Sequence, residues 1–295
     1  MILIPVILRQ DILTPTHQKS IRQRRITSRK IGGNCFGKSK VRTIACLSLS
    51  GGQGKTTTAL LLGRSLALSG HKVLVIDADP QANLTFYLGH QVAPDEPTLL
   101  EVMQRSVDTA HGIYPSRYEQ LFLIPADSAL NKVQDYLSTS GMGAVVLRKR
   151  LEPVANLFEY GIIDSPPQRS QICLSVVGAA DLILIPVEAS TKGVNSLLRS
   201  LEQVEELRDI GAFTGQVLGV LPFRDRWFGR SQAKDSRDAI EAMRQIAQDI
   251  PILPSILESE QYKRAIRQGQ TLAEMGQADL QLPFEKMIEL LHARR

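Results

Sequence analysis

The sequence predicts an α/β fold of the doubly wound class, with a mostly parallel sheet and helices on both of its faces. Short apolar runs alternate along the chain with helix-length segments, in the βαβα order that produces such sheets. A glycine-rich stretch, SLSGGQGKTTT at 48–58, joins the first run to the first helix. With 295 residues and 43% hydrophobic residues, the chain can bury a core of this size.

Seven runs are predicted as strands because they are apolar almost throughout, as in a sheet that is covered on both faces. They are residues 43–49, 72–77, 121–126, 160–164, 181–187, 215–222 and 251–256. Helices are expected in the longer segments at 55–69, 127–137, 143–157, 192–209, 232–248, 257–268 and 283–293. No repeat, linker or transmembrane segment appears after residue 41, so we expect a single domain over 41–295.

The excess of basic residues is concentrated at the start of the chain. Residues 1–40 hold nine Lys and Arg side chains and one acid, whereas the other 255 residues hold 26 basic and 29 acidic ones. The opening run MILIPVIL is shorter than the ~20 residues of a membrane span, and its basic part follows the apolar part, unlike in a secretory signal. We expect residues 1–40 to be a disordered basic extension or a segment that the native protein lacks.

The cysteines at 35, 46 and 173 share no CxxC spacing and have no cluster of histidines beside them. The sequence therefore indicates neither a metal centre nor a disulfide framework. A reducing cytoplasm fits this cysteine usage best.

The glycine-rich stretch lies where a strand passes into a helix. Glycines there let backbone N–H groups approach a phosphate, and the helix N-terminus favours an anion. Lys55 is expected to reach the β- and γ-phosphates, and the Thr56 hydroxyl to bind Mg²⁺. A glycine-rich helix entry with an exposed lysine is the alternative. The predicted nucleotide-binding residues are Gly51, Gly52, Gln53, Gly54, Lys55, Thr56, Thr57 and Asp77.

Three aspartates follow two of the other predicted strands. Asp77 and Asp79 belong to DADPQAN after the strand 72–77, and Asp164 ends the strand 160–164. Because parallel strands end at the same edge of a sheet, all three are expected to converge on the γ-phosphate. Hydrolysis requires one carboxylate for the metal shell and another to orient the attacking water. Helix or turn capping is the alternative role of such aspartates.

The loop departs from the usual GxxxxGK[ST] spacing, because Leu49 stands at the position of the first glycine. It fits the deviant form x-K-G-G-x-G-K-[ST], except that Ser50 occupies the lysine position.

Four stretches, GGQGKTTT, DADPQANLT, IIDSPP and AADLILIPVEAS, together resemble the ParA/MinD family of deviant Walker ATPases, which are P-loop NTPases of the SIMIBI class. The resemblance covers residues 41–275, and DADPQ is similar to the ParA branch. It implies that Lys55 and Thr56 act on phosphate and Mg²⁺, that Asp79 governs water attack, and that Asp164 binds the metal through water. It also implies ATP hydrolysis in a homodimer that encloses ATP, with the ATP-bound dimer on non-specific DNA.

The family's deviant lysine reaches across the dimer to the other subunit's nucleotide, and Ser50 carries no charge that could replace it. Some cation must compensate for two triphosphates in one interface. Lys192 is the predicted replacement in catalysis, because it follows the strand 181–187 and opens a helix at the nucleotide edge. A solvated surface lysine is the alternative. Serine at this position resembles the carboxysome-positioning members of the family, the McdA group.

DNA binding must come from a local basic patch, since the domain without its extension is slightly acidic. The candidates are Arg224, Arg226, Arg230, Lys234, Arg237, Lys263, Arg264 and Arg267. Trp227 and Phe228 are expected either to flank the adenine or to be ordinary core or surface aromatics. The last helix has its apolar residues at 284, 287, 288 and 291 on one face. Docking on the domain's own core is favoured over membrane binding, because Glu285 and Glu289 lie on its polar face.

The resemblance implies a cytoplasmic, nucleoid-associated ATPase that positions a cargo under the control of an adaptor of the McdB or ParB type. The cargo is a carboxysome or, alternatively, a plasmid or chromosome. A MinD-like regulator on a membrane and a DNA-binding regulator with vestigial hydrolysis are the further alternatives. An iron–sulfur reductase is excluded because Cys173 has no companion cysteine nearby.

Overall fold

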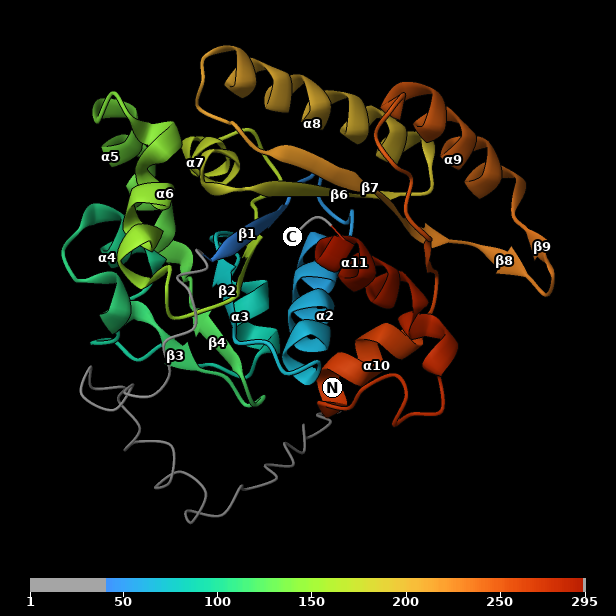
Figure 1. Cartoon of the computed structure of the whole chain (residues 1–295), viewed down its shortest axis with the longest axis horizontal. Coiled ribbons are helices and arrows are strands. Elements are labelled where there is room, and N and C mark those ends of the chain that lie inside the picture. Colours follow the sequence, from blue (N-terminus) through green and yellow to red (C-terminus); the bar gives the residue numbers. More distant parts are fainter. Residues whose placement is uncertain (1–40, 294–295) are drawn as a thin grey trace, which may run out of the picture. The chain divides into compact units, whose positions relative to one another are not determined.

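An eight-stranded sheet forms the centre of the described part of the chain, residues 41–293 (Figure 1). The structure is a computed structural model, and the predicted extension, residues 1–40, lies outside the described residues. The strands follow the order β10-β7-β6-β1-β5-β2-β4-β3. All neighbouring strands are parallel except the short pair β3 and β4. The predicted doubly wound, mostly parallel sheet is therefore confirmed.

The central strands are buried and apolar because helices cover both of their faces. They are β1 (Arg42–Cys46), β2 (Val73–Asp77), β4 (Leu121–Ile124), β5 (Tyr160–Asp164), β6 (Leu182–Glu188) and β7 (Gln216–Asp225). The edges are formed by β10 (Ile256–Leu257) and β3 (Tyr114–Pro115). The predicted strand 251–256 was wrong over most of its length, because Pro251 and Pro254 lack the N–H groups that a strand donates.

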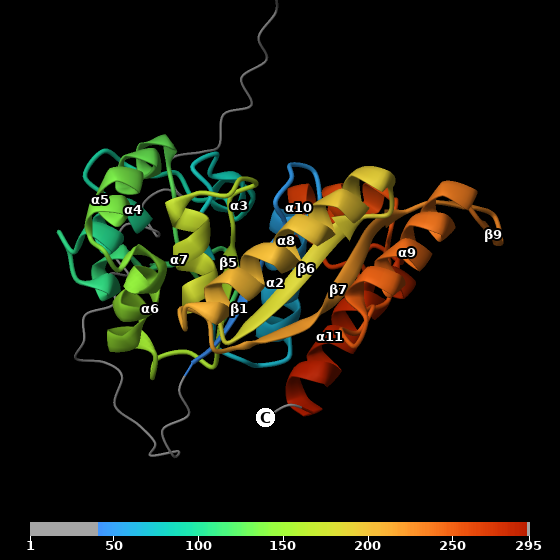
Figure 2. The same cartoon turned by 90° about the horizontal axis from the view of Figure 1, so that it is seen from above.

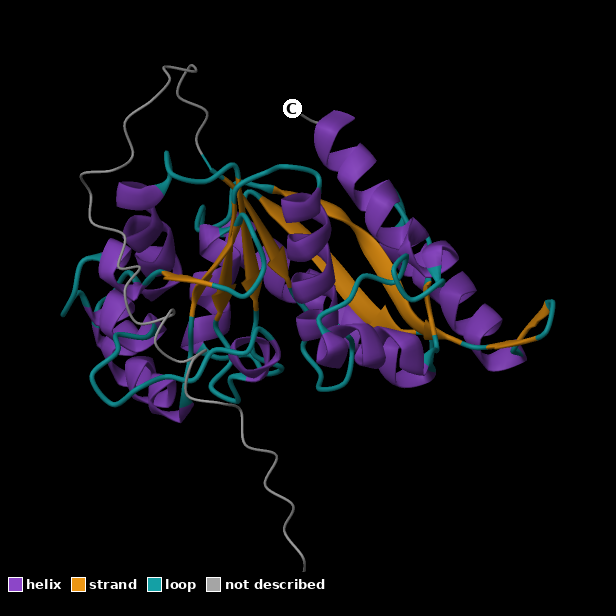
Figure 3. Ribbon diagram, turned by 90° about the horizontal axis from the view of Figure 1, so that it is seen from below, coloured by secondary structure: helices purple, strands orange, loops and turns teal. Residues whose placement is uncertain are grey.

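Ten α-helices are found in residues 41–293. They are α2 (Lys55–Leu68), α3 (Asn83–Tyr87), α4 (Leu99–Gln104), α5 (Val133–Thr139), α6 (Val146–Leu151), α7 (Gln171–Ala179), α8 (Thr191–Asp209), α9 (Lys234–Ala247), α10 (Glu260–Gln268) and α11 (Leu282–Ala293). In Figures 1 and 2, α8 and α9 cover one face of β6 and β7, and α2 and α11 lie on the other. Figure 3 shows the strands between these layers.

Several elements differ from the predicted ones. The expected helix 143–157 is a short α6 between two 3₁₀ turns, the second of which spans Glu152–Val154 and contains Pro153. The expected helix 127–137 starts as a 3₁₀ turn before α5. Helix α7 was not predicted, because it is buried along most of its length and so lacks a one-sided apolar pattern. The hairpin of β8 (Trp227–Phe228) and β9 (Ser231–Gln232) was not predicted either.

The C-terminal helix α11 packs on the domain's own core, as predicted. Its side chains Phe284, Met287 and Leu291 are buried in the cluster that also holds the apolar side chains of α2. The Arg42 guanidinium donates to the carbonyl of Leu291 at 2.7 Å and ties the end of the helix to the first strand. Within residues 41–293 no helix has both the length and the apolarity that a bilayer span requires.

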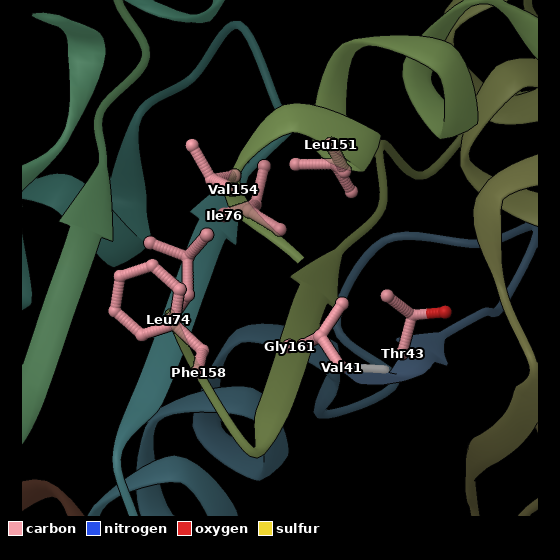
Figure 4. Close-up of a pocket in the computed structure, with 8 residues that line it drawn as sticks. All are labelled: Val41, Thr43, Leu74, Ile76, Leu151, Val154, Phe158 and Gly161. Atoms are coloured by element: carbon pink, nitrogen blue, oxygen red, sulfur yellow. The ribbon is translucent and has the colours of Figure 1, made fainter. Parts of the chain in front are cut away.

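A small apolar pocket lies between the sheet and the segment that follows α6 (Figure 4). Its walls include Leu74 and Ile76 of β2, together with Leu151, Val154 and Phe158. The one hydroxyl among its lining residues, that of Thr43, already donates to the carbonyl of Ala179. The pocket therefore offers no polar group suited to a phosphate, and the glycine-rich loop is not among its walls.

Truncation of Phe284 tests the docking of α11. Because this side chain is 1% exposed, Phe284→Ala should lower the free energy of unfolding by about 3–5 kcal/mol in urea denaturation. Lys286→Ala, on the exposed side of the same helix, should change it by less than ~0.5 kcal/mol. Equal unfolding curves for both variants would mean that α11 does not pack on the core in solution.

Candidate nucleotide-binding site

The parallel register brings three strand ends together beside the glycine-rich loop. Cys46 at the end of β1 is the register partner of Asp164 in β5, and Asp164 is the partner of Asp77 in β2. The loop leaves β1 at this edge and enters α2 at Lys55. The predicted convergence of the loop and the strand-end aspartates is therefore present in the structure.

The loop has the backbone shape that an anion-binding turn needs. Gly52 and Gly54 have φ angles of +81° and +92°, which residues with a Cβ rarely adopt. A Cβ on Gly54 would lie 2.6 Å from the ring of Phe223, so only glycine fits there. In the described structure, a Cβ on Gly51 or Gly52 would meet no atom within 4 Å, and no side chain caps the start of α2. Phosphate oxygens could therefore approach its first N–H groups.

Lys55 lies at the base of the loop and is buried. Its Nζ donates to the carbonyl of Ser50 at 3.0 Å, which directs the side chain back along the loop. Burial lowers the pKa of Lys55 from its usual value, while the carboxylates of Asp164 and Asp79 oppose that shift. An anionic ligand beside the ammonium would favour its charged form in the same way.

Asp164 is fully buried at the end of β5. Among the described residues, no donor makes a well-aligned hydrogen bond with either of its oxygens, although the Thr56 hydroxyl is close enough to interact. Burial raises the pKa of Asp164 well above its usual range, and the neighbouring Asp77 adds to the increase. A hydroxyl beside a buried carboxylate with free acceptor capacity fits a hydrated Mg²⁺ ion.

Asp77 and Asp79 have different environments. Both the N–H and the hydroxyl of Thr85 donate to Oδ2 of Asp77, at 2.8 and 2.7 Å, and the N–H of Asp79 donates to its Oδ1 at 3.2 Å. Asp77 thus holds the start of α3, and its contact with nucleotide stays a prediction. Asp79 is 8% exposed and accepts the N–H of Gln81 at 3.0 Å. No hydrogen bond from a described residue occupies its second oxygen, which keeps its acceptor capacity.

Gln53 and Lys192 connect the loop to the end of β6 and the start of α8. The side-chain oxygen of the buried Gln53 accepts the N–H of Glu188 at 2.8 Å, so this residue anchors the loop. The exposed ammonium of Lys192 donates to the carbonyl of Gly51 at 3.0 Å. The predicted replacement cation therefore lies on its own chain's loop, at the nucleotide edge. Its action across a dimer stays a prediction.

The predicted DNA-binding residues are distributed over the end of β7, the β8–β9 hairpin, α9 and α10. Lys263, Arg267 and Arg224 all lower the pKa of Glu260, the first residue of α10, so Arg224 lies close to the basic residues of that helix. Several of these cations pair with acids: Arg224 with Glu188, Arg226 with Asp235, Arg237 with Asp238 and Lys263 with Glu260. Arg230, Lys234 and Arg264 have no ion pair with a described residue. The patch is therefore only partly neutralised.

The two predicted adenine-flanking aromatics lie on the β8–β9 hairpin. Trp227 and Phe228 are 47% and 74% exposed. The indole N–H of Trp227 donates to Oδ2 of the buried Asp225 at 3.0 Å, and the amide of Gln232 donates to the same carboxylate. The core alternative for these aromatics was therefore wrong.

The sequence did not reveal that one face of α8 holds the loop. Ser196, Arg199 and Ser200 contact residues 48–50 of the loop. Two small polar residues four positions apart on a helix are a weak signal of a buried polar contact. Nothing in the sequence indicated which segment they contact.

Comparisons with known proteins agree with this geometry. A family model described as an AAA domain matches residues 41–210. The chain is 58% identical over 249 residues to maintenance of carboxysome distribution protein A of Synechococcus elongatus, which covers 84% of this chain and 98% of that protein. It is 34% identical over 169 residues to the chromosome partitioning protein ParA of Caulobacter vibrioides, covering 56% of this chain and 63% of ParA. The ATP complex of a Cyanothece McdA variant superposes with a TM-score of 0.85 at 57% identity, covering 86% of this chain and 97% of McdA.

The buried Asp77 should make stability depend on pH. Burial is the main cause that raises its pKa from 3.8 to about 6. Because the folded pKa lies above the unfolded one, the favourable contribution of the protonated group is lost as pH rises from 3.8 to 6. Asp77→Asn stays neutral, so the free energy of unfolding of the wild type should fall relative to this variant by up to about 3 kcal/mol over that range. Urea denaturation at several pH values measures this difference, and parallel pH profiles would contradict it.

Proposed function

Because the chain belongs to the ParA/MinD type of AAA-domain ATPases, with maintenance of carboxysome distribution protein A as a relative over most of its length, we propose that it is a nucleotide switch that positions a cargo on DNA. Family membership supports ATP binding and a positioning role. Hydrolysis, dimerisation, DNA binding and control by an adaptor are the proposed parts. The observation that carries the proposed hydrolysis is the convergence of Lys55, Asp79 and Asp164 at the glycine-rich loop.

The loop and the start of α2 bind the phosphates of ATP. Gly51, Gly52 and Gly54 let the backbone approach, and Lys55 moves from the carbonyl of Ser50 to the phosphate oxygens. Mg²⁺, when bound, supplies positive charge at these oxygens, and the residues that would hold it are Thr56 directly and Asp164 through water. The negative charge of bound ATP would also oppose the burial that lowers the pKa of Lys55.

Asp79 orients the attacking water. Its carboxylate lies on the short segment between β2 and α3, and the N–H of Gln81 fixes one of its oxygens. The other oxygen can accept a proton of water beside the terminal phosphate. Hydrolysis by such a site is a slow switch between two states of the protein rather than a metabolic reaction.

Two protomers enclose the nucleotides, and Lys192 supplies charge at their interface. The carbonyl of Gly51 holds its exposed ammonium at the loop. This neutral acceptor gives little energy to a solvated lysine, so a triphosphate on a second protomer can compete for it. Lys192 then takes the role that a lysine at position 50 has in other members of the family.

The ATP-bound dimer binds DNA without reading its sequence. The basic groups of β7, α9 and α10 are doubled when two protomers associate, so affinity rises when ATP is bound. Arg230, Lys234, Arg264 and Arg267 are the residues proposed to contact phosphates. The protein is then cytoplasmic and nucleoid-associated.

The relative from Synechococcus favours carboxysomes as the cargo over a plasmid or a chromosome. An adaptor of the McdB type, in place of a ParB-type partner, would stimulate hydrolysis and release the dimer from DNA. A MinD-like role on membranes is less well supported, because the apolar face of α11 is buried in the core. Flotation with anionic liposomes in the presence of ATP distinguishes the two locations.

Removal of Lys192 tests the proposed dimer. Lys192→Ala should bind ATP as a monomer within about twofold of the wild type, while ATP-dependent dimers fall at least tenfold, because charge at the interface is lost. Sedimentation with a non-hydrolysable ATP analogue measures both species. Lys149→Ala is the matched control, because Lys149 is exposed and paired with Glu152 away from the loop. Unchanged dimerisation of Lys192→Ala would refute its role, and a monomeric wild type at saturating ATP would refute the dimer.

Removal of Arg267 tests the DNA surface. Arg267→Ala should weaken binding of random duplexes similarly for every sequence, and the slope of log affinity against log salt should fall by about 1. Fluorescence anisotropy at several salt concentrations with ATP measures this slope. Arg169→Ala removes an exposed arginine that pairs with Glu206 and should leave it unchanged. The same slope for Arg267→Ala and the wild type would place the DNA elsewhere.

A further inference from the structure

One face of α8 lies along the first residues of the glycine-rich loop. The hydroxyls of Ser48 and Ser196 are 2.9 Å apart and fully buried. The N–H of Leu49 donates to the hydroxyl of Ser200 at 3.2 Å, and this hydroxyl in turn donates to the carbonyl of Ser196 at 2.7 Å. These contacts fix the end of the strand against the helix before the loop begins its turn.

The contacts continue into the turn through two exposed cations. Nη2 of Arg199 donates to the hydroxyl of Ser50 at 3.2 Å, and Nζ of Lys192 donates to the carbonyl of Gly51 at 3.0 Å. Lys55 contacts the same turn through the carbonyl of Ser50. Three cations therefore meet on two consecutive residues, although their positive charges repel one another.

Ser50 is the residue that makes this arrangement possible. Its side chain accepts a hydrogen bond from Arg199 while its backbone carbonyl accepts one from Lys55. A lysine at position 50 has donors only, so it could not accept the bond from Arg199 and would repel the guanidinium. Serine at the deviant position and arginine at 199 thus belong to one contact. This explains what Ser50 does, beyond the absence of a lysine.

We infer that Arg199 is a positioning residue for the ATP-dependent dimer. It holds Ser50, and through Ser50 it fixes the turn from which Lys55 faces the chain's own nucleotide and Lys192 faces the second protomer. The inference rests on the proposed function, because it concerns the turn that lies in the dimer interface. In the alternative, Arg199 is an ordinary surface residue whose bond that matters is the one from its Nε to the carbonyl of Asn195, at 3.4 Å. Its removal would then leave the dimer unchanged.

A double-mutant cycle tests whether Arg199 acts through Ser50. The variants are Arg199→Ala, Ser50→Ala and the double variant. The readout is the concentration of a non-hydrolysable ATP analogue that gives half of the protein as dimer in sedimentation. Each single variant should raise it about five- to tenfold, as the loss of one charge-assisted hydrogen bond predicts. The double variant should lie within about twofold of either single variant, since both remove the same contact.

Two further variants separate positioning from a general effect of charge or stability. Arg199→Lys keeps a donor for Ser50 and should recover most of the loss, to within about threefold of the wild type. Arg208→Ala removes an exposed arginine at the other end of the same helix and should match the wild type. Affinity of the monomer for the analogue and the melting temperature without nucleotide should stay near the wild-type values in Arg199→Ala, because the side chain is exposed.

The outcomes that overturn the inference are distinct from those that overturn the proposed function. Wild-type dimerisation in Arg199→Ala, or effects of the two single variants that multiply in the double variant, would refute the role of Arg199 alone. If Arg199→Ala lowered the melting temperature together with dimerisation, the loss of dimers would follow from lost stability. Arg199 would then be only a structural contact. A wild-type protein that stays monomeric at saturating analogue would refute the dimer, and the inference with it.

Discussion

The buried carboxylate of Asp164 is the constraint on which the rest of the site depends. A carboxylate without well-formed hydrogen bonds in the core is costly, and its raised pKa expresses that cost. The register of β1, β5 and β2 places it between Cys46 and Asp77, where water has little access. Positive charge from Lys55 offsets only part of the penalty. A bound nucleotide with its metal ion would bring positive charge and water to this carboxylate. The fold thus gives up some stability without ligand in order to keep Asp164 ready for the metal.

The loop is held from two sides by contacts of different chemistry. On one side, Gln53 and the ring of Phe223 fix it to the ends of β6 and β7. On the other, serines and cations of α8 contact it through polar groups. The first contacts are buried and rigid, whereas the exposed cations of α8 can exchange neutral partners for anionic ones. This division lets the loop keep its shape while the charges around it rearrange.

The sequence predicted those parts of the molecule that local patterns encode. The strand 160–164 and its terminal Asp164 were found because an apolar run ends in a carboxylate, and the loop because its glycines lie between a strand and a helix. Helix α7 was missed because it is apolar along its length, and the β8–β9 hairpin because its strands have two residues each. The contact of Arg199 with Ser50 joins residues 149 positions apart, so no local pattern records it. The argument from the missing cation selected Lys192, and the structure places this lysine at the loop, while its action across a dimer stays a prediction.

The contact between Gly54 and the ring of Phe223 has an evolutionary consequence. Any residue larger than glycine at position 54 would need the aromatic ring to move first, and it would still have to adopt a left-handed backbone. A smaller residue at 223 would leave a gap beside the loop, which removes packing without creating a tolerated alternative at 54. Phe223 thus adds a steric barrier to the one that the backbone already imposes, so glycine at position 54 should persist in this lineage even where residue 223 changes.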